Sequence, residues 1–178
     1  IAGLPGETVE SFGLGFDQLY ALRPHEIQFG ILKRLRGTPI IRHTDEFAMK
    51  YDPFPPYTIL ANRDIDFTTM QRLVRFARYW DLVANSGRFA NTLPVMLGDA
   101  PFTRFMAFSD WIYAHTDATH RIALDRLAKL VLQWLHTQGM SLDAAQALLE
   151  SDYAGKQPKV NDEKKSAALQ RQAVRLAA

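Results

Sequence analysis

Apolar residues near the start of the chain first follow a helical spacing and then alternate with polar residues. Between residues 9 and 20 they recur at spacings of three and four, which predicts an amphipathic helix. These residues are Val9, Phe12, Phe16, Leu19 and Tyr20. Pro24 ends the helix, because proline cannot continue the hydrogen-bond ladder. From residue 25 to 33 the period changes to two, which predicts a strand.

The two faces of this predicted strand differ in polarity. Ile27, Phe29 and Ile31 share one face, and Gln28 and Gly30 share the other. Because the turn Gly3-Leu4-Pro5-Gly6 before the helix is typical of a strand end, the order strand, helix, strand predicts a βαβ unit. Two strands cannot complete a parallel sheet or barrel. The chain therefore resembles the cut end of a larger α/β protein, with the apolar face packed on helices and Gln28 facing the cavity.

The remainder of the chain is predicted to be helical. Three prolines exclude regular structure from Asp52 to Tyr57 and mark a domain boundary. Apolar periodicity and capping residues predict helices over residues 44–49, 89–97, 101–115, 124–135 and 141–149, and a long helix to residue 83 that is capped by Asp64 or Asp66. Residues 155–178 are polar and charged, and either form a final helix or are disordered. The expected fold is mainly α with a small α/β N-terminal piece, organised as 1–52, 53–154 and 155–178.

Composition narrows the possible functions. The chain has 178 residues, no cysteine and a formal net charge of +2. Without cysteine it cannot ligate an iron–sulfur cluster or a thiolate zinc site, or form a disulfide. The near balance of charges gives no general reason to bind nucleic acid or an anionic membrane. No apolar run approaches the length of a spanning helix and no signal peptide opens the chain, so a cytoplasmic protein is expected.

Two short motifs and their order carry a resemblance to a known family. Ile1-Ala2-Gly3-Leu4-Pro5-Gly6-Glu7-Thr8 resembles the end of the fifth barrel strand in radical S-adenosylmethionine (SAM) enzymes. Leu35-Arg36-Gly37-Thr38-Pro39 is similar to the turn after their sixth strand. Pro56-Tyr57, Tyr79 and the segment Asn85-Ser86-Gly87-Arg88-Phe89 resemble an uncharacterised helical domain. That domain follows the barrel in radical SAM proteins that also carry a cobalamin-binding domain.

The resemblance implies cofactors for a longer parent protein. The parent would use a [4Fe–4S] cluster and SAM to make a carbon radical, with cobalamin as methyl carrier. Its three-cysteine loop is missing here, so this fragment alone is expected to hold no cofactor and to be inactive. By resemblance, Gly3, Pro5 and Glu7 lie on the SAM side in the parent. An ordinary strand-to-helix turn explains the same glycines without any ligand.

Candidate substrate-facing residues follow from the predicted strand. Gln28 is on its polar face, and Lys33, Arg34 and Arg36 follow its C-terminal end, where barrel enzymes keep their active sites. A solvated loop would explain the three cations equally well. Five histidines lack the spacing of a metal site, and no other catalytic motif stands out.

Two functions remain open at this point. One is the C-terminal part of an oxidoreductase or methyltransferase-like radical SAM enzyme, whose helical domain caps the barrel or shapes the substrate site. Its partners would be the rest of the barrel, the cobalamin-binding domain and an unknown substrate. The alternative is a non-enzymatic helical interaction module. In either case, an unpaired edge at residues 27–32 is expected to promote self-association.

Overall fold

The computed structural model describes residues 1–154, and within them the fold is mainly helical. The longer helices are α1 (Val9–Ala21), α2 (Phe67–Trp80), α4 (Pro101–Thr116), α5 (Leu124–Thr137) and α6 (Leu142–Ala154). The shorter elements are η1 (Pro39–His43), β1 (Lys50–Tyr51), β2 (Ile59–Ala61), η2 (Asp81–Asn85) and α3 (Thr92–Leu97). Mainly α with a small α/β piece is confirmed, and the predicted tail at 155–178 lies outside the described residues.

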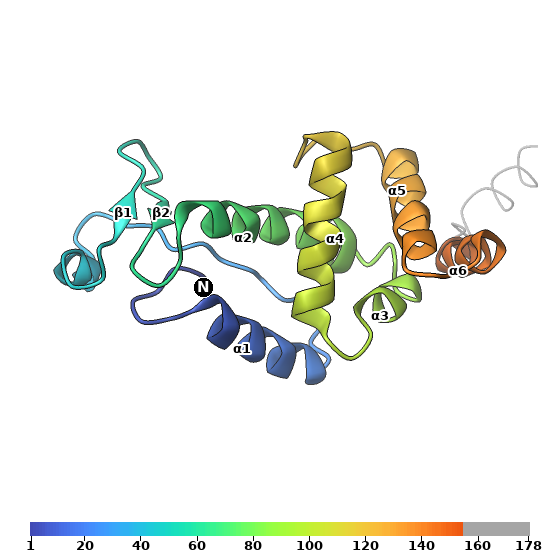
Figure 1. The fold of residues 1–178 in the computed structure, drawn as a ribbon, viewed down its shortest axis with the longest axis horizontal. Coiled ribbons are helices and arrows are strands. Elements are labelled where there is room, and N and C mark those ends of the chain that lie inside the picture. The colour runs from blue at the N-terminus through green and yellow to red at the C-terminus, as the bar shows by residue number, and fades with distance from the viewer. Residues whose placement is uncertain (155–178) are drawn as a thin grey trace, which may run out of the picture.

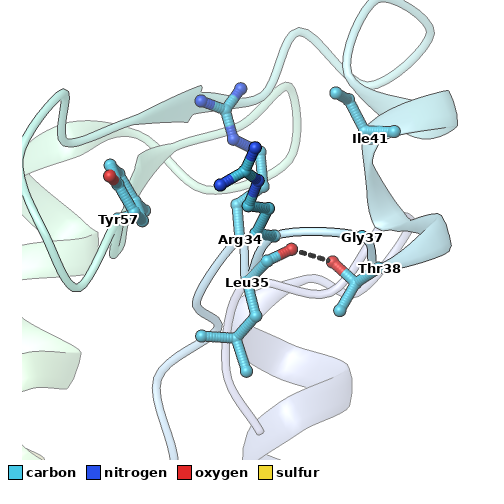
Figure 2. A pocket seen from close by; sticks show the side chains of 7 residues that line it. Arg34, Leu35, Gly37, Thr38, Ile41 and Tyr57 are labelled. Carbon is cyan, nitrogen blue, oxygen red and sulfur yellow. Dashed lines mark hydrogen bonds between the residues drawn. The ribbon is translucent and has the colours of Figure 1, made fainter.

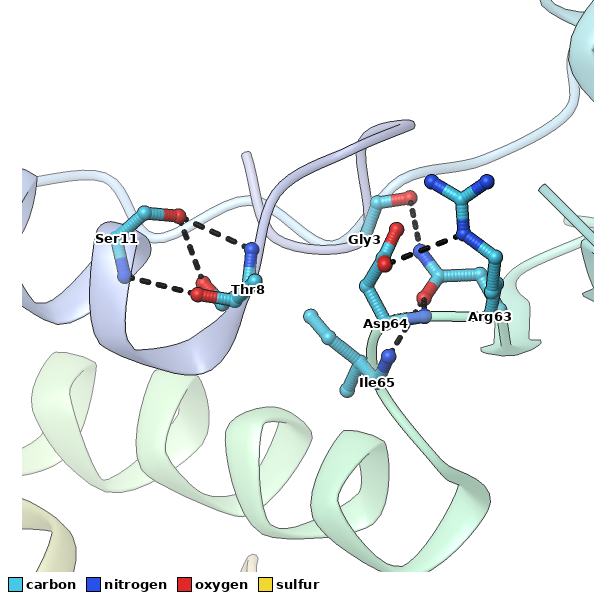
Figure 3. Close-up of polar contacts among 7 residues, drawn as sticks. Gly3, Thr8, Ser11, Arg63, Asp64 and Ile65 are labelled. Atoms are coloured by element: carbon cyan, nitrogen blue, oxygen red, sulfur yellow. Dashed lines mark hydrogen bonds and ion pairs between the residues drawn. The ribbon is translucent and has the colours of Figure 1, made fainter.

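Helix α1 begins where the sequence predicts, at a reciprocal cap. The Ser11 backbone N–H donates to Thr8 Oγ1 at 3.2 Å, and the Thr8 N–H donates to Ser11 Oγ at 3.0 Å (Figure 3). These bonds satisfy backbone donors that a helix N-terminus otherwise leaves free. The helix ends at Ala21, three residues before Pro24.

The segment 27–33 makes isolated bridges in place of the continuous strand that its alternation predicts. Ala2 bridges to Ile31 in parallel, and Lys33 bridges to Thr58 in the antiparallel sense. The Leu32 N–H donates to the Ala2 carbonyl, while the Leu32 carbonyl accepts from Ile59, both at 2.9 Å. A βαβ connection is therefore present in minimal form. The antiparallel neighbour, Thr58, leads directly into β2, which pairs with β1. This neighbour was not predicted.

The expectation of an unpaired edge at residues 27–32 is wrong at both ends of the segment. The Asn85 side chain accepts from the Ile27 N–H at 3.2 Å and donates to the Ile27 carbonyl at 3.0 Å. Asn85 thus bonds both backbone groups of one residue, as a neighbouring strand would. Farther along, Gly30 and Leu32 are bonded to Ala2, and Leu32 is also bonded to Ile59. These contacts remove the main argument for self-association through this edge.

Aromatic side chains join the N-terminal piece to the helices. Phe29 lies 4.8 Å from Phe76 of α2, measured between ring centroids, and 4.7 Å from Phe12 of α1. Phe16 meets Trp80 edge-to-face at 4.8 Å. The apolar face of the 27–33 segment therefore packs on helices, as predicted, and the buried residues form one cluster that extends from Ala2 to Leu149.

Helices α2 and α4 cross at the centre of the molecule, with α1 beside them, the small sheet at one end and α5–α6 at the other (Figure 1). Of the two caps predicted for α2, Asp64 and Asp66, the structure has Asp66, whose side chain accepts from the Thr69 N–H at 2.7 Å. Pro101 begins α4 and Ser141 caps α6, both as predicted.

Two predicted helices differ from those observed. The helix expected over residues 44–49 is replaced by turns, and a 3₁₀-helix, η1, precedes it with Pro39 at its first position. Helix α3 begins at Thr92, not at residue 89. The backbone N–H groups of Asn91 and Thr92 donate to the Asp152 carboxylate of α6 at 2.5 and 3.2 Å. This distant cap fixes the start of α3, and local sequence does not reveal it.

The proline-rich segment at the predicted domain boundary forms a loop between paired strands. Strands β1 and β2 pair across it in antiparallel fashion. The Asp52 N–H also donates to the Thr58 carbonyl at 2.9 Å. Backbone contacts therefore cross the boundary predicted at residue 52. None of the helices within residues 1–154 is both long and apolar enough to cross a membrane.

Candidate functional site

Two turns that follow adjacent parallel-bridged segments define the candidate site. The first is Gly3–Glu7, directly after Ala2, and the second is Lys33–Thr38, which begins two residues after Ile31. Because Ala2 and Ile31 are paired in parallel, the chain leaves both toward the same edge. The two groups of residues that the sequence singled out therefore belong to one edge of the small sheet.

Gly3 holds the first turn in a conformation that another residue would not tolerate. Its φ is +91°, in the region that side chains disfavour. A Cβ atom here would lie 2.7 Å from the Ile59 side chain. The Gly3 carbonyl accepts from Asn62 Nδ2 at 3.3 Å (Figure 3). Close packing and a buried hydrogen bond therefore account for this glycine without a ligand.

The segment that holds the first turn is itself tightly bonded. Asn62 is buried, and its Oδ1 accepts from the N–H groups of Asp64 and Ile65 at 2.9 and 2.7 Å. Arg63 pairs with Asp64 at 3.3 Å (Figure 3). Its guanidinium also lies over the Phe47 ring, 4.5 Å from the ring centroid. The Arg63 charge is thus neutralised locally, and this part of the edge presents no free cation.

Glu7 is the member of the SAM-side group with unsatisfied hydrogen-bonding capacity. Its Oε2 is buried and has no hydrogen-bond partner within residues 1–154. Burial raises the pKa of the Glu7 carboxyl, and the positive chain terminus lowers it in part. Pro5 is half-buried beside it. The Glu7 carboxyl group can therefore accept a hydrogen bond from a bound donor. Gly3 and Pro5 have no polar side chain and cannot do so.

The second turn forms a pocket of about 680 Å³. Its lining comes from the turn, from η1 and from the proline-rich loop: Arg34, Leu35, Arg36, Gly37, Thr38, Ile41 and Tyr57. Figure 2 shows Arg34 between Tyr57 on one side and the segment with Thr38 and Ile41 on the other. This volume is typical of sites for small molecules.

Of the four predicted substrate-facing residues, two line the pocket. Arg34 and Arg36 do, whereas Lys33 is exposed outside the lining and Gln28 is exposed farther back on the segment. The position of Gln28 follows from the interrupted pairing, since residues 27–30 do not form a regular strand that would aim one face at a cavity. Two residues predicted from the strand end therefore line the pocket, and the residue predicted from the strand face does not; that any of the four faces a substrate stays a prediction.

Arg34 is held by two contacts, and one of its partners is itself held in place. Its guanidinium carbon lies 5.0 Å from the centroid of the Tyr51 ring, a cation–π contact. Its backbone N–H donates to the Tyr57 carbonyl at 3.0 Å. Tyr57 has a φ of +59°, an unusual value for a bulky residue, and the N–H of Tyr57 donates to Phe54 at 2.9 Å. These contacts fix the wall of the pocket around Arg34.

Sequence reasoning missed part of the lining. Thr38 Oγ1 donates to the Leu35 carbonyl at 2.6 Å, which closes the turn (Figure 2). Gly37 has a φ of +80°, so the turn needs glycine there. The turn motif signalled both residues. Tyr57 was singled out only as part of the Pro56-Tyr57 motif; nothing local placed it in the pocket, which it reaches because the segment before β2 pairs with Lys33 and Arg34.

Other candidate groups do not form a site. Arg72 belongs to a basic stripe on α2, but it pairs with Asp110 of α4 at 2.7 Å. Within residues 1–154 there is no group of three or more histidine or acidic side chains that could hold a metal ion. The pocket and the Glu7 turn are therefore the features that the geometry brings forward.

Comparison with known proteins gives one family. No curated protein and no solved structure matches the chain. The family described as "Protein of unknown function (DUF4080)" matches residues 45–173, which includes Tyr57 and helices α2 to α6. Residues 1–44, with the Gly3 turn and the arginines of the pocket, lie before the match. By this match the chain belongs to the DUF4080 family.

Proposed function

We propose that this chain is the C-terminal part of a cobalamin-dependent radical SAM enzyme, in which it supplies the last βα elements of the barrel and a helical domain that shapes the substrate site. The observation that supports this most is the parallel bridge between Ala2 and Ile31, with α1 between them in sequence. A parallel pair joined by a helix is the repeating unit of such barrels.

The position of the two turns is a second support. Active sites of βα barrels lie at the C-terminal ends of the strands. The Gly3–Glu7 turn and the pocket around Arg34 both follow such ends, on neighbouring segments. In the proposal the first faces SAM and the second faces the substrate.

The residues present fit the expected cofactors unequally. The chain has no cysteine, so the [4Fe–4S] cluster would be held by another part of the longer protein. Glu7 fits a SAM-side position, because its buried Oε2 has no partner among the described residues. When bound, the cluster and SAM would supply a carbon radical, and cobalamin a methyl group. The role of Glu7 would be to accept a hydrogen bond and orient the bound group.

The helical domain has a defined part in this proposal. The family region contributes Tyr57 to the pocket wall, and α2 packs on the 27–33 segment through Phe76 and Phe29. A domain that both supports the barrel strand and lines the pocket would shape the substrate site. This favours the enzyme over a free-standing interaction module.

The proposal is tested in two steps. The coding sequence upstream should contain a cysteine triplet with gaps of three and two residues; a start codon directly before Ile1 would support the interaction module. The longer polypeptide, prepared without oxygen and reduced, should then convert SAM to 5′-deoxyadenosine. Glu7→Gln should weaken SAM binding. Glu26→Gln should not, because Glu26 is an exposed acid directly before the 27–33 segment. Absence of SAM cleavage by a polypeptide with a full cluster would contradict the proposal.

A further inference from the structure

The pocket at the second turn concentrates positive charge without a counter-charge. Two of its lining residues are arginines, and none of those that line it within the described chain is acidic. Arg34 and Arg36 have no ion-pair partner among residues 1–154, in contrast to Arg63 and Arg72, which pair with aspartates. A concave surface with two unpaired guanidinium groups attracts anions.

The same pocket exposes apolar side chains. Leu35 and Ile41 line it and remain 56% and 61% exposed, respectively. Large apolar side chains that line a concave surface this openly gain free energy when a ligand covers them. Tyr57 adds an aromatic wall opposite Ile41 (Figure 2).

The cationic group is also positioned in advance. Arg34 is half-buried, and its contacts with Tyr51 and its backbone bond to Tyr57 restrict where the guanidinium can lie. The turn that carries Arg36 is closed by the Thr38 hydroxyl. Groups that are ordered before binding lose little conformational freedom when a ligand arrives.

From these observations we infer that the pocket binds an organic anion, a phosphate or carboxylate joined to an apolar body, with Arg34 and Arg36 on the anionic group and Leu35, Ile41 and Tyr57 on the body. This inference rests on the proposed function only for the role of the ligand, which would be the substrate of the enzyme. Binding of the anion itself depends on this chain alone. Guanidinium pairs bidentately with either anion, so the shared chemistry is the monovalent or divalent oxyanion.

The test is an amide NMR titration of the chain with four probes. Phenyl phosphate and phenylacetate combine an anion with an aromatic body, inorganic phosphate is the anion alone, and benzyl alcohol is the body alone. We expect the two combined probes to shift the amides of Gly37 and Thr38, and the two partial probes to bind at least about tenfold more weakly. The tighter of the two combined probes identifies the anion. Equal binding of inorganic phosphate or of benzyl alcohol would overturn the inference.

Variants assign the binding to the arginines. Arg36→Gln should weaken the tighter combined probe about tenfold, and Arg36→Lys, which keeps the charge but not the fork, should have an intermediate effect. Arg126→Gln on α5 is the matched control, because it removes one exposed positive charge far from the pocket. Unchanged affinity in Arg36→Gln, or an equal loss in Arg126→Gln, would overturn the assignment.

The two proposals can fail separately. Binding of a combined probe with no SAM cleavage by the longer polypeptide would retain the anion pocket and remove the radical SAM function. SAM cleavage with no binding of either combined probe would do the reverse.

Discussion

The central pair α2–α4 is joined to both neighbouring regions by aromatic packing, but only one of these regions is also held by a buried polar cap. On one side the N-terminal piece is held by aromatic rings: Phe16 and Phe29 both pack against Phe76. On the other side Trp134 of α5 packs against Phe108 and Trp111 of α4. There, α6 also contacts α3 through the buried carboxylate of Asp152, which accepts two backbone bonds. Ring packing is broad and weakly directional, whereas a carboxylate cap depends on one side chain.

A truncated βα piece is expected to be loosely attached, because it lacks its own sheet partners. Instead its aromatic residues complete the main core, so its attachment is spread over many contacts. The α5–α6 end has the more regular helices by sequence, yet the start of α3 meets it through polar contacts from Asp152 and Ser151 of α6.

The largest expected effect comes from Phe76→Ala. Phe76 is fully buried and contacts rings from α1, from the 27–33 segment and from α4. Removing it should lower the free energy of unfolding by about 3–5 kcal/mol, since a cavity forms where the N-terminal piece meets the α2–α4 pair. Urea unfolding followed by fluorescence and by circular dichroism measures this.

The control for Phe76→Ala is Phe54→Ala. Phe54 is 73% exposed, so its truncation should change stability by no more than about 0.5 kcal/mol. Unfolding of the wild-type chain in two steps, with the N-terminal piece unfolding first, would show that the aromatic core does not hold the N-terminal piece to the α2–α4 pair.

Asp152→Ala tests the polar attachment. It leaves the backbone N–H groups of Asn91 and Thr92 without their acceptor, which should lower stability by about 1–3 kcal/mol. Hydrogen exchange should accelerate first in α3. Asp143→Ala, an exposed acid on the same helix, is the matched control. Equal acceleration across α1 and α3 would show that the cap does not act locally.

A pair of glycines in α1 tests how closely the N-terminal piece approaches α4. A Cβ at Gly13 would lie 2.5 Å from the Phe102 ring, whereas nothing lies within 4 Å of one at Gly15. Gly13→Ala should therefore destabilise by about 1 kcal/mol net, because ring displacement exceeds the gain in helix propensity. Gly15→Ala should stabilise by about 0.5–1 kcal/mol. Thermal unfolding of both variants decides; equal signs would mean that α1 can shift on α4.

The smallest expected effect depends on pH. The pKa of the Glu7 carboxyl is raised by burial from its ordinary value of 4.5. As pH rises through this value, the unfolded carboxyl loses its proton before the folded one, so stability falls over that window. Glu7→Gln should remove this loss. The stability of the variant relative to the wild type should therefore be higher at pH 7 than at pH 4.

Glu10→Gln is the control for Glu7→Gln and should show the opposite sign. Hydrogen bonds from its own backbone N–H and from Thr8 lower the pKa of Glu10. At pH values above the ordinary pKa of a glutamate, the charged carboxylate therefore stabilises the folded state. The variant should therefore lose stability at pH 7 and not at low pH. If both variants respond alike in urea unfolding at the two pH values, burial does not distinguish the two carboxyls.

Local sequence signals predicted most of the helices. The three–four spacing around Leu127 and Val131 located α5, and Pro101 located the start of α4. These signals are local, because a helix bonds residues four apart. The start of α3 was misplaced because its cap, Asp152, lies about 60 residues away in sequence.

The candidate site was predicted in the same partial way. Arg34 and Arg36 were found because the C-terminal end of a strand can be located from alternation. Tyr57 and Ile41 were not, because their place in the pocket depends on strand pairing and on η1, which no periodic pattern encodes. Gln28 was selected by strand parity, which requires a regular ladder that the chain does not form.

The bond between Asn85 and Ile27 has a consequence for the order of events during synthesis. Asn85 lies 58 residues after Ile27, so Ile27 leaves the ribosome well before the side chain that covers its backbone. At about 5–20 residues per second, the interval is roughly 3–12 s. During that time the 27–33 segment can be reached by other nascent chains. Once Asn85, at the end of the π-helical turn, has been synthesised, it can bond the Ile27 backbone and end this period of exposure.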